Sequence, residues 1–370
     1  MTLHIFNPEH DIALASGLAN FTAPHAGSRL RHDLGWLPLL WAQAGDCVLV
    51  DDKDAALRGW QRLCARLAVM PPGGTEPSLT TWRQRGDRVG ADAVSPWGWD
   101  AALRAALQRR GVAESLMPTE GQATVVRQLS HRSTAARLLP LLRFEGTVGE
   151  AWACTTMDET VQRIDSIGRR VVLKAPWSSS GRGLRFVESS EKMLPNVASW
   201  VENVLKGQGN VMVEPYYNKV KDFGMEFMAH ADGRVSYEGL SLFSTKNGAY
   251  TGNLLATETH KRQLISRYVS QGLLNEVARR ICSHMEQVLK EAGVTPFVGP
   301  FGADMMVVAA QQGQAPFLLH PCVEINLRRT MGHVALALTP LVNPKADDEV
   351  VRVMRIALED NQYKLKIERL

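Results

Sequence analysis

The chain has 370 residues, of which 45% are hydrophobic and 22% are charged, a balance typical of globular domains and not of disordered or fibrous chains. This length exceeds what one ordinary hydrophobic core accommodates, so more than one domain is expected. The formal net charge is only +4 and no long run of Lys or Arg occurs, which argues against a nucleic-acid partner.

The cysteines and the N-terminal residues bear on cellular location. The five cysteines are scattered, odd in number and free of any C-x-x-C pair, which argues against a zinc site and a disulfide framework. The first ten residues lack the basic segment and long apolar stretch of a signal peptide, and no apolar run approaches the roughly 20 residues of a membrane span. We therefore expect reduced thiols, no membrane partner and a cytoplasmic location.

The N-terminal part predicts alternating strands and helices. Strands are expected at residues 3–6 and 47–50, with a helical stretch at 34–43 between them, which makes a β-α-β beginning. A later helix over residues 101–110 ends at Gly111, as expected of a C-terminal glycine cap.

The rest of the chain predicts antiparallel strands with helices. The predicted strands lie at residues 171–174, 184–187, 210–213, 224–230, 235–237, 302–309 and 316–326. The predicted helices lie at residues 130–142, 197–206, 273–292, 334–338 and 347–358.

A lysine and a Ser/Gly-rich loop follow the predicted strand at residues 171–174. Lys174 ends this strand, and Ala175-Pro176-Trp177-Ser178-Ser179-Ser180-Gly181-Arg182-Gly183 follows it. A lysine that leaves a strand can reach a phosphate oxygen, and a loop of small residues can place backbone N–H groups over a polyphosphate. The order of lysine before glycines differs from the P-loop. Taken alone, an ordinary polar hairpin with an exposed lysine explains the segment equally well.

A group of oxygen-bearing side chains lies on the predicted strand at residues 316–326. Residues two apart on a strand face the same side, so Glu324, Asn326 and Arg328 project together, with Asp304 available from the preceding strand. Mg²⁺ is usually held by one or two carboxylates together with substrate phosphates. The alternative is a strand with one solvated polar face. We favour a metal site, because clustered carboxylates on such an apolar strand pair need a counter-charge.

A third segment joins the predicted strand at residues 210–213 to Glu214-Pro215-Tyr216-Tyr217, with Asp222 after it. An extended backbone can hydrogen-bond an adenine edge, and a carboxylate can accept both ribose hydroxyls. Taken alone, a strand that enters a loop is the simpler interpretation.

The order of these three segments resembles the ATP-grasp superfamily, such as D-alanine–D-alanine ligase and the L-amino-acid ligases. The resemblance covers residues 125–338 and is strongest at 174–183 and 324–328. It implies an α/β (α+β) ATP-grasp fold, in which two α+β lobes grip ATP, preceded by a Rossmann-like N-terminal domain. The implied domains are the Rossmann-like residues 1–122, the small lobe 123–208 with the phosphate-covering loop, and the large lobe 209–370 with the metal site.

Carried over by position, the resemblance implies a complete nucleotide and metal site. Lys174 would bind the α/β-phosphates, Glu214 and Tyr216 would meet adenine, and Asp222 would meet the ribose. The implied ATP-binding residues are Arg132, Lys174, Ser179, Ser180, Gly181, Gly183, Glu214, Tyr216 and Asp222. The implied metal ligands are Asp304, Glu324 and Asn326, with Mg²⁺ as the expected ion and Mn²⁺ as the alternative.

Two arginines place the chain within the superfamily. A further cation, usually Lys, precedes the first strand in the family, and Arg132 stands in the comparable place. D-alanine ligases carry an arginine two residues before the metal-binding Asp, where this chain has Gly302, whereas Arg328 follows the Asn as in the amino-acid ligases. The resemblance thus argues against D-alanine ligase itself and implies Lys174 and Arg328 as catalytic residues, with Arg328 stabilising the acyl phosphate.

Polar segments outside these motifs are candidate substrate contacts. Residues 7–11 and 96–100 fall where the family's substrate-binding preceding domain would lie, although helix caps and turns explain them at least as well. Residues 241–253 predict a polar loop that could close over an acceptor or remain a plain surface loop. The candidate substrate contacts are Glu9, Tyr250, Asn253 and Arg328.

Together these patterns favour an ATP- and Mg²⁺-dependent, ADP-forming carboxylate–amine (C–N) ligase with small-molecule substrates. The γ-phosphoryl group of ATP would pass to a carboxylate, and an amine would then displace phosphate. Two alternatives stay open: a phosphotransferase on a hydroxyl substrate, and a non-catalytic nucleotide-binding regulatory module. The sequence identifies neither the carboxylate nor the amine, and a homodimer is an open possibility.

Overall fold

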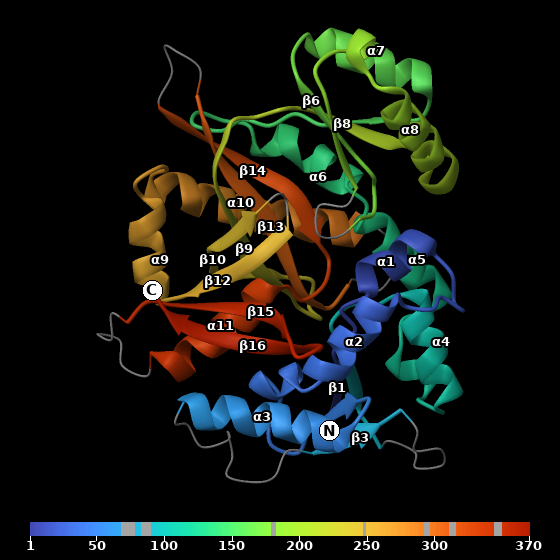
Figure 1. Ribbon diagram of the computed structural model, residues 1–370, viewed down its shortest axis with the longest axis vertical. Helices are drawn as coiled ribbons and strands as arrows, with labels where there is room; N and C mark the ends of the chain where they lie inside the picture. Colours follow the sequence, from blue (N-terminus) through green and yellow to red (C-terminus); the bar gives the residue numbers. More distant parts are fainter. Residues whose placement is uncertain are drawn as a thin grey trace. The chain divides into compact units, whose positions relative to one another are not determined.

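The computed structural model describes residues 1–67, 78–82, 90–178, 183–246, 249–291, 297–310, 316–343 and 350–370 (Figure 1). The chain divides into two compact units. The first unit comprises Met1–Arg127, Thr251–Lys261 and Arg328–Leu370, and the second comprises Gln128–Tyr250 and Arg262–Leu327. The domain boundaries expected at residues 122 and 208 stay a prediction. Within the described ranges, no helix is both long and apolar enough to cross a membrane.

A parallel sheet forms the centre of the first unit. Its strands lie in the order β3-β2-β1-β4 and all pair in parallel. They are β1 (Thr2–Ile5), β2 (Cys47–Val50), β3 (Leu79–Thr81) and β4 (Ala93–Pro96). The parallel order with helical connections confirms the predicted Rossmann-like character of this part, and the strand predicted at residues 47–50 has the predicted bounds.

The helices of this N-terminal part are α1 (His10–Ser16), α2 (His25–Leu34), α3 (Lys53–Leu67), α4 (Ala101–Arg109) and α5 (Glu120–Leu129), with the 3-10 helices η1 (Leu37–Leu40) and η2 (Glu114–Leu116). The helix predicted over residues 34–43 is wrong: α2 ends at Leu34, and a separate 3-10 turn carries Pro38 near its start. Proline lacks the N–H that a continuing helix would need, so a new turn begins there.

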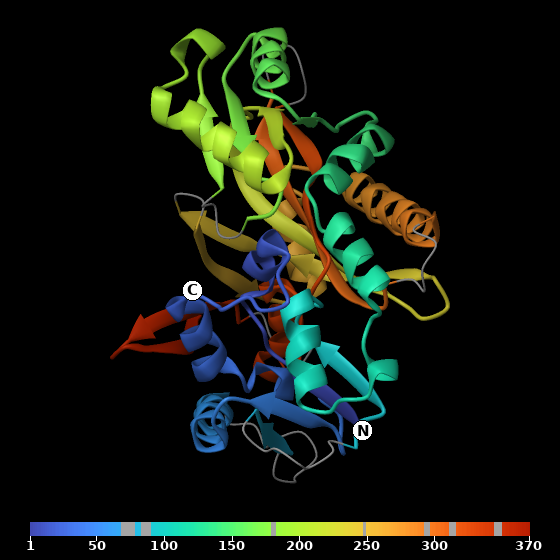
Figure 2. The same cartoon turned by 90° about the vertical axis from the view of Figure 1, so that its right-hand side faces the viewer.

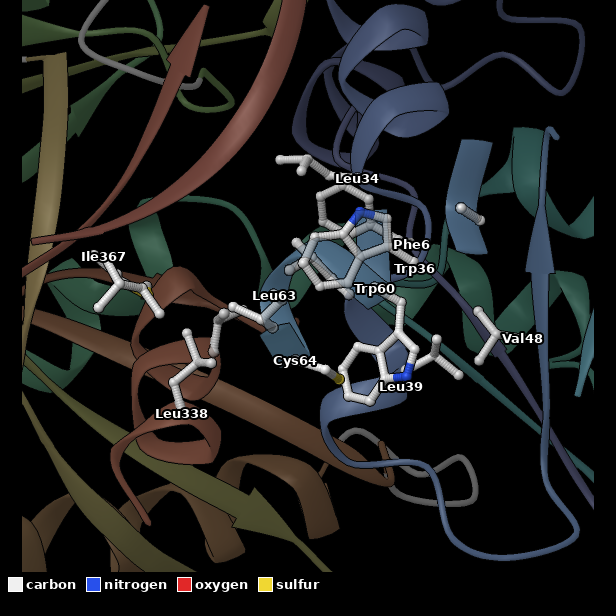
Figure 3. Close-up of a cluster of buried hydrophobic side chains, with 14 of the residues drawn as sticks. Phe6, Leu34, Trp36, Leu39, Val48, Trp60, Leu63, Cys64, Leu338 and Ile367 are labelled. Atoms are coloured by element: carbon white, nitrogen blue, oxygen red, sulfur yellow. The ribbon is translucent and has the colours of Figure 1, made fainter. Parts of the chain in front are cut away.

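The two faces of the parallel sheet are both buried. Val48 and Val50 pack on one face with Trp36 and Trp60, whereas Cys47 and Leu49 pack on the other face against α4. The indole rings of Trp36 and Trp60 lie 6.1 Å apart between centroids, beside side chains from the C-terminal part of the unit (Figure 3). Burial on both faces is the normal state of parallel strands covered by helices.

The C-terminal part of the first unit contains α11 (Met331–Val342), β15 (Arg352–Glu359), β16 (Gln362–Arg369) and the end of β12 (Ala249–Leu255). The helix predicted over residues 347–358 is wrong, because its described part forms β15, which pairs antiparallel with β16. Asp360 and Asn361 have positive φ angles of 50° and 62° and close the hairpin between the strands. Asp and Asn tolerate this backbone conformation, which two-residue hairpin turns require.

The second unit contains two antiparallel sheets. One has the order β10-β9-β13-β14 and the other the order β5-β8-β6-β7. The strands of the first are β9 (Lys219–Ala229), β10 (Val235–Ser241), β13 (Gly299–Ala309) and β14 (Phe317–Asn326). The strands of the second are β5 (Trp152–Cys154), β6 (Val171–Lys174), β7 (Leu184–Val187) and β8 (Val211–Pro215).

Helices cover one face of each antiparallel sheet. The remaining helices are α6 (Ser133–Leu138), α7 (Met157–Ile167), α8 (Pro195–Gln208), α9 (Glu258–Ile265) and α10 (Gln271–Glu291), with the 3-10 helices η3 (Leu139–Leu142) and η4 (Ser190–Lys192). α7 and α8 pack on the β5-β8-β6-β7 sheet (Figure 1). α10 packs against β9 and β10 (Figure 2).

The loop predicted over residues 241–253 is wrong. This stretch forms the end of β10, then β11 (Phe243–Lys246) and β12, with residues 247–248 outside the described ranges. Tyr250 and Asn253 therefore lie on a strand. Alternating polar and apolar residues explain the error, because a half-buried strand and a polar loop have similar compositions.

Candidate functional site

One face of the β10-β9-β13-β14 sheet is apolar. Side chains alternate between the two faces along a strand, so the odd-numbered residues of β9 and β13 share a face. Phe223, Met225, Phe301 and Ala303 on that face are all fully buried. The even-numbered residues point to the opposite face, which leaves that face for polar side chains.

The strand register arranges the residues of this opposite face in three rows across β9, β13 and β14. The first row consists of Glu226, Gly302 and Asn326, the second of Gly224, Asp304 and Glu324, and the third of Asp222, Met306 and His320. A β-bulge interrupts the β13–β14 ladder between the second and third rows. The register therefore places Asp222, Asp304, Glu324 and Asn326, all predicted from the sequence, on the same face of the sheet.

The second row sets two carboxylates against one another. Asp304 and Glu324 are direct cross-strand partners, whose Cβ atoms in such pairs lie about 5 Å apart. Gly224 fills the β9 position of the row, where a Cβ would come 3.2 Å from the Ala303 oxygen and 3.5 Å from Asp304 Oδ1. Glycine at this position thus keeps space beside the carboxylates.

Asn326 adds an amide oxygen in the first row, next to the carboxylate pair. Two carboxylates and one amide oxygen suit Mg²⁺, which binds oxygen ligands and keeps positions for water and phosphate. In the described part of the chain, no group of three or more His, Cys, Asp or Glu side chains could hold a metal ion. The set of Asp304, Glu324 and Asn326 therefore fits an ion whose remaining ligands come from a bound phosphate.

Glu226 is a candidate residue that the sequence reasoning missed. It lies in the first row, across Gly302 from Asn326, and its side chain is buried. The signal in the sequence is the spacing of Asp222, Gly224 and Glu226, which places all three on one face of a strand. A buried carboxylate beside the predicted ligands makes Glu226 part of the same polar face.

Lys174 and Glu214 form a buried ion pair on the β5-β8-β6-β7 sheet. Lys174 Nζ lies 2.6 Å from Glu214 Oε2, and the side chains are only 8% and 5% exposed. Val172 is the cross-strand partner of Glu214, and Lys174 shares its face two residues later. Because α7 and α8 pack on the other face, the pair points away from both helices. A buried ammonium requires such a partner, since an unpaired buried charge is strongly unfavourable.

Arg132 links the Ser/Gly-rich segment to the second row. Its Nη2 donates to Glu324 Oε2 at 2.8 Å, and its Nη1 donates to Ser178 Oγ at 2.7 Å and to the backbone oxygen of Ala175. The backbone N–H of Arg132 also donates to the Pro176 oxygen at 3.3 Å. This buried guanidinium therefore holds the start of the segment beside a predicted metal ligand.

Charges from both antiparallel sheets act on one buried thiol. Cys322 is fully buried on β14, and burial is the main cause that raises the pKa of its thiol. The negative charges of Asp304, Glu214 and Glu324 raise this pKa further, whereas the positive charge of Lys174 lowers it. The carboxylate pair of the second row and the Lys174–Glu214 pair thus both lie near enough to Cys322 to act on its thiol.

The end of the Ser/Gly-rich loop is compact. The backbone N–H of Ala175 donates to the Gly183 oxygen at 2.9 Å. A Cβ on Gly183 would clash with the Ser178 side chain, so glycine is required for this close approach. Residues 179–182, which include the predicted Ser179, Ser180 and Gly181, lie outside the described ranges.

Tyr216 and Asp222, predicted for the nucleoside, have protein partners. The Tyr216 ring lies 4.4 Å from the Arg170 guanidinium carbon and 5.8 Å from the Phe186 ring centroid. Asp222 Oδ2 lies 2.5 Å from Lys219 Nζ and accepts a hydrogen bond from Thr245 Oγ1 at 2.6 Å. Asp222 keeps its place in the third row, on the face of the metal candidates.

Arg328 forms a two-pronged ion pair with Asp11 in the first unit. Nε lies 2.7 Å from Asp11 Oδ1 and Nη2 lies 2.7 Å from Asp11 Oδ2. β14 ends at Asn326, so the expectation that Arg328 continues the polar face of that strand is wrong. The chain leaves the sheet before this residue, and the parallel fork of the guanidinium matches the carboxylate of α1.

The remaining candidate substrate residues are tied into the first unit or into β12. Arg31 forms an ion pair with Glu9, and burial raises the pKa of the Glu9 carboxyl although Arg31 opposes this. Asn253 is buried opposite Met354 of β15. Burial also raises the pKa of Tyr250. Tyr250 and Asn253 thus lie on a strand and not on a loop.

Residues 7–11 and 96–100 bind one another past the ends of β1 and β4. Asn7 Nδ2 donates to the Gly98 oxygen at 2.9 Å, and His10 Nδ1 lies 3.1 Å from Asp100 Oδ2. Asp100 Oδ1 also accepts from the Leu103 N–H at 2.8 Å and caps α4. The helix-cap interpretation of this segment is therefore confirmed for Asp100.

Residues 132–295 match the family model described as the carbamoyl-phosphate synthase L chain, ATP binding domain. A search of curated proteins gave no match. The chain is similar to the solved biotin carboxylase domain of the Hydrogenobacter thermophilus 2-oxoglutarate carboxylase in complex with MgADP, ADP and bicarbonate, with 14% identity, a TM-score of 0.51, and 97% of this chain and 75% of that chain covered.

Two further solved structures share the fold. N5-carboxyaminoimidazole synthetase from Staphylococcus aureus, complexed with ADP, is 10% identical with a TM-score of 0.50, over 97% of this chain and 83% of that chain. Pyruvate carboxylase from Rhizobium etli is 14% identical with a TM-score of 0.52, over 96% of this chain but 31% of that chain. The chain has the ATP-grasp fold, which confirms the predicted fold class, and part of it matches an ATP-binding domain model.

Proposed function

We propose that this chain is an ATP- and Mg²⁺-dependent, ADP-forming ligase that activates a substrate carboxylate as an acyl phosphate and joins it to an amine. The observation that carries the proposal is the meeting of the opposed carboxylates Asp304 and Glu324 with the cations Lys174 and Arg132. A magnesium nucleotide needs both kinds of group, since its phosphates bind cations and its metal ion binds carboxylates. The matched ATP-binding domain model and the ADP complexes of similar structures support this reading.

The metal ion, Mg²⁺ or Mn²⁺ in its place, would be held by Asp304, Glu324 and Asn326. When bound, it supplies positive charge to the phosphate oxygens as phosphoryl transfer proceeds. Glu226, buried in the first row, extends the acidic face beside Asn326. The three predicted ligands project from one rigid sheet, which keeps their mutual positions fixed.

Lys174, Arg132 and the loop at residues 179–183 would bind the phosphates. In the structure Lys174 pairs with Glu214 and Arg132 pairs with Glu324. An ammonium group has three donors and a guanidinium has five, so each cation can keep its carboxylate and still donate to a phosphate oxygen. The two ion pairs therefore hold both cations in place for the nucleotide.

The other predicted roles complete the proposal. The backbone of Glu214 and Tyr216 would meet the adenine, and Asp222 would accept the ribose hydroxyls. The small-molecule carboxylate and amine would contact Glu9, Tyr250, Asn253 and Arg328. A homodimer stays a prediction; the biotin carboxylase domain of the H. thermophilus protein is described as a dimer.

The proposed reaction has two balanced steps. A carboxylate oxygen attacks the γ-phosphorus, a new O–P bond forms, and the bond to the β–γ bridging oxygen breaks to release ADP. The amine nitrogen then attacks the acyl carbon, a C–N bond forms, and phosphate leaves with the C–O bond electrons while the nitrogen loses its surplus protons to phosphate and solvent. Lys174 and Arg132 lower the barrier by placing fixed positive charge where negative charge grows.

The test is a screen of the purified full chain with ATP, Mg²⁺ and a broad panel of carboxylates and amines. ADP release and product mass are measured together, with and without EDTA. The ligase predicts ADP that depends on both substrates and on metal, and a product whose mass equals carboxylate plus amine minus water.

The same screen separates the alternatives. A product heavier than a hydroxyl substrate by one phosphoryl group would indicate the phosphotransferase. Calorimetric binding of Mg·ATP without turnover on any substrate would indicate a non-catalytic nucleotide-binding module. Failure to bind Mg·ATP would contradict all three functions.

A further inference from the structure

Arg329 is a half-buried cation of the first unit that has no carboxylate beside it. Its backbone N–H donates to the Trp97 oxygen at 2.8 Å, which anchors the residue next to the end of β4. Within the described ranges, no side-chain nitrogen of Arg329 has a hydrogen-bond or ion-pair partner, and its Nε is buried. An unpaired charge that is removed from water is unfavourable, so this guanidinium needs an anionic partner.

Arg31, another half-buried arginine of the first unit, shows the contrast. Burial lowers the pKa of Arg31, but the carboxylates of Glu9 and Asp51 more than reverse this effect and leave the pKa above its usual value. For Arg329, burial is the only cause of the change, and it lowers the pKa to about 10. The Arg329 guanidinium is therefore still protonated at neutral pH, and nothing nearby in the described part of the chain balances its charge.

Three further polar groups lie around Arg329. Its guanidinium carbon lies 4.4 Å from the ring centroid of Trp41, whose buried Nε1 has no partner among the described residues. Burial and the charge of Arg329 lower the pKa of His4 although Asp46 opposes them, which places His4 near the guanidinium. Ser95 of β4 is the partner of His4 in the parallel ladder and therefore lies beside it.

This group of side chains is accessible from solvent. Arg329, Trp41 and Ser95 are each half-buried, so part of every one of these side chains remains exposed. His4 is buried, with Nε2 3.1 Å from Asp46 Oδ2 and with Nδ1 unpartnered within the described ranges. Because the Asp46 carboxyl is ionised at neutral pH, Nε2 carries the proton and Nδ1 presents a lone pair.

We propose that Arg329, Trp41 and Ser95 form a binding site for a small carboxylate with a single negative charge. The proposal goes beyond the proposed function and requires no nucleotide. The planar fork of a guanidinium matches both oxygens of a carboxylate, and the indole N–H and the serine hydroxyl add donors. One cation balances one negative charge, whereas a phosphate dianion would bring a second charge next to the His4 lone pair.

The test measures binding of acetate, the probe for such a carboxylate, to the full-length chain. In the wild type, acetate should bind saturably in saturation-transfer NMR and should raise the melting temperature at fixed ionic strength. Formate should displace acetate at a similar concentration. Phosphate, a dianion at about pH 8, should displace it only at a concentration at least about ten times higher.

Variants of Arg329 locate the site. Arg329→Met removes the charge and should weaken acetate binding by at least about tenfold. Without acetate it should melt at the wild-type temperature or above, because it removes an unpaired charge from a half-buried position. Arg329→Lys, which keeps the charge but lacks the planar fork, should recover only part of the affinity. Arg58→Met, exposed on α3, is the matched control and should bind acetate like the wild type.

The outcomes separate this site from the proposed function. Absence of saturable acetate binding by the wild type would overturn the proposal, and so would unchanged acetate affinity in folded Arg329→Met. Arg329→Met that melts far below the wild type would make Arg329 a structural cation and would also overturn it. Equal displacement by formate and phosphate would refute the preference for a single charge. Failure to bind Mg·ATP would contradict the proposed function alone, because the carboxylate site needs no nucleotide.

Discussion

Lys174 and Glu214 show how a single buried cation can serve both the fold and the reaction. The ammonium is held by a carboxylate 2.6 Å away on the neighbouring strand, so its position is fixed before any phosphate arrives. Lys174→Ala removes the charge that would stabilise the transferring phosphoryl group. We expect ADP formation to fall by at least about a hundredfold, as with other removed transition-state donors.

Lys206→Ala is the matched control for this prediction. Lys206 lies exposed on α8 of the same unit and should leave turnover unchanged. Circular dichroism and a melting curve would establish that Lys174→Ala stays folded. Normal ADP formation by folded Lys174→Ala would remove Lys174 from the site.

Asp46 predicts a pH dependence of stability. Burial alone would raise the pKa of its carboxyl, but hydrogen bonds from the Thr2 and Gln43 N–H groups and from His4 lower it to about 2. Because the folded pKa lies below the unfolded one, Asp46 stabilises the fold above about pH 4 and this contribution is lost as the pH falls through about 2.

Asp46→Asn should therefore be less stable than the wild type at neutral pH, and the difference in unfolding free energy should shrink in acid. Urea denaturation at about pH 7, 4 and 2 measures this difference. A difference that stays constant over this range would show that Asp46 does not act through its charge.

At the residue scale, the sequence predicts the site residues whose positions follow from a pattern within one strand. Lys174 ends a strand of clear pattern, and alternation along one strand places Glu324 and Asn326 on the same face. Glu226 was missed because its importance comes from the register of β9, β13 and β14, which a single strand does not reveal. The Arg132–Glu324 bond joins residues 192 positions apart, and no local pattern predicts such a pair.

At the element scale, Gly98 allows the segment after β4 to pack on the segment after β1. A Cβ on Gly98 would lie 2.6 Å from His10 Cδ2, and the His10 ring is fixed by its bond to Asp100. Gly98→Ala must displace this buried ring, and we expect a loss of about 1–3 kcal/mol in unfolding free energy.

Gly121→Ala provides the contrast for Gly98→Ala. Gly121 lies on α5, where the nearest atom to an added Cβ is 3.9 Å away. This change should be neutral or stabilise the protein by up to about 1 kcal/mol, because alanine favours helix over glycine. Equal effects of the two substitutions in urea titrations would refute the packing explanation.

Strands were predicted more accurately than helices, for physical reasons. The pattern of β-branched residues around Val171 and Cys47 gave the bounds of β6 and β2. The helix expected over residues 347–358 became β15, because the Asp360–Asn361 turn and the pairing with β16 decide its conformation. Prolines broke two expected helices into an α-helix and a 3-10 turn, at Pro38 and Pro140.

At the scale of the whole molecule, chain order and spatial order differ. Residues 328–370 follow the site strand β14 but belong to the first unit, where Leu338 and Ile367 share a core with Trp36 and Trp60 (Figure 3). A sequence read from end to end assigns these residues to the preceding lobe. Which core a segment joins depends on long-range packing, which local propensity does not determine.

Transfer of an oxygen atom from the carboxylate to phosphate shows directly whether the chain activates its substrate as an acyl phosphate. The carboxylate found in the substrate screen is labelled with ¹⁸O in both oxygens and incubated with the chain, ATP, Mg²⁺ and the amine. If an acyl phosphate forms, the amine displaces phosphate that carries one carboxylate oxygen, so ¹⁸O should appear in the released phosphate in equal amount to the amide. Amide formation with unlabelled phosphate would contradict activation of the carboxylate by the γ-phosphoryl group of ATP.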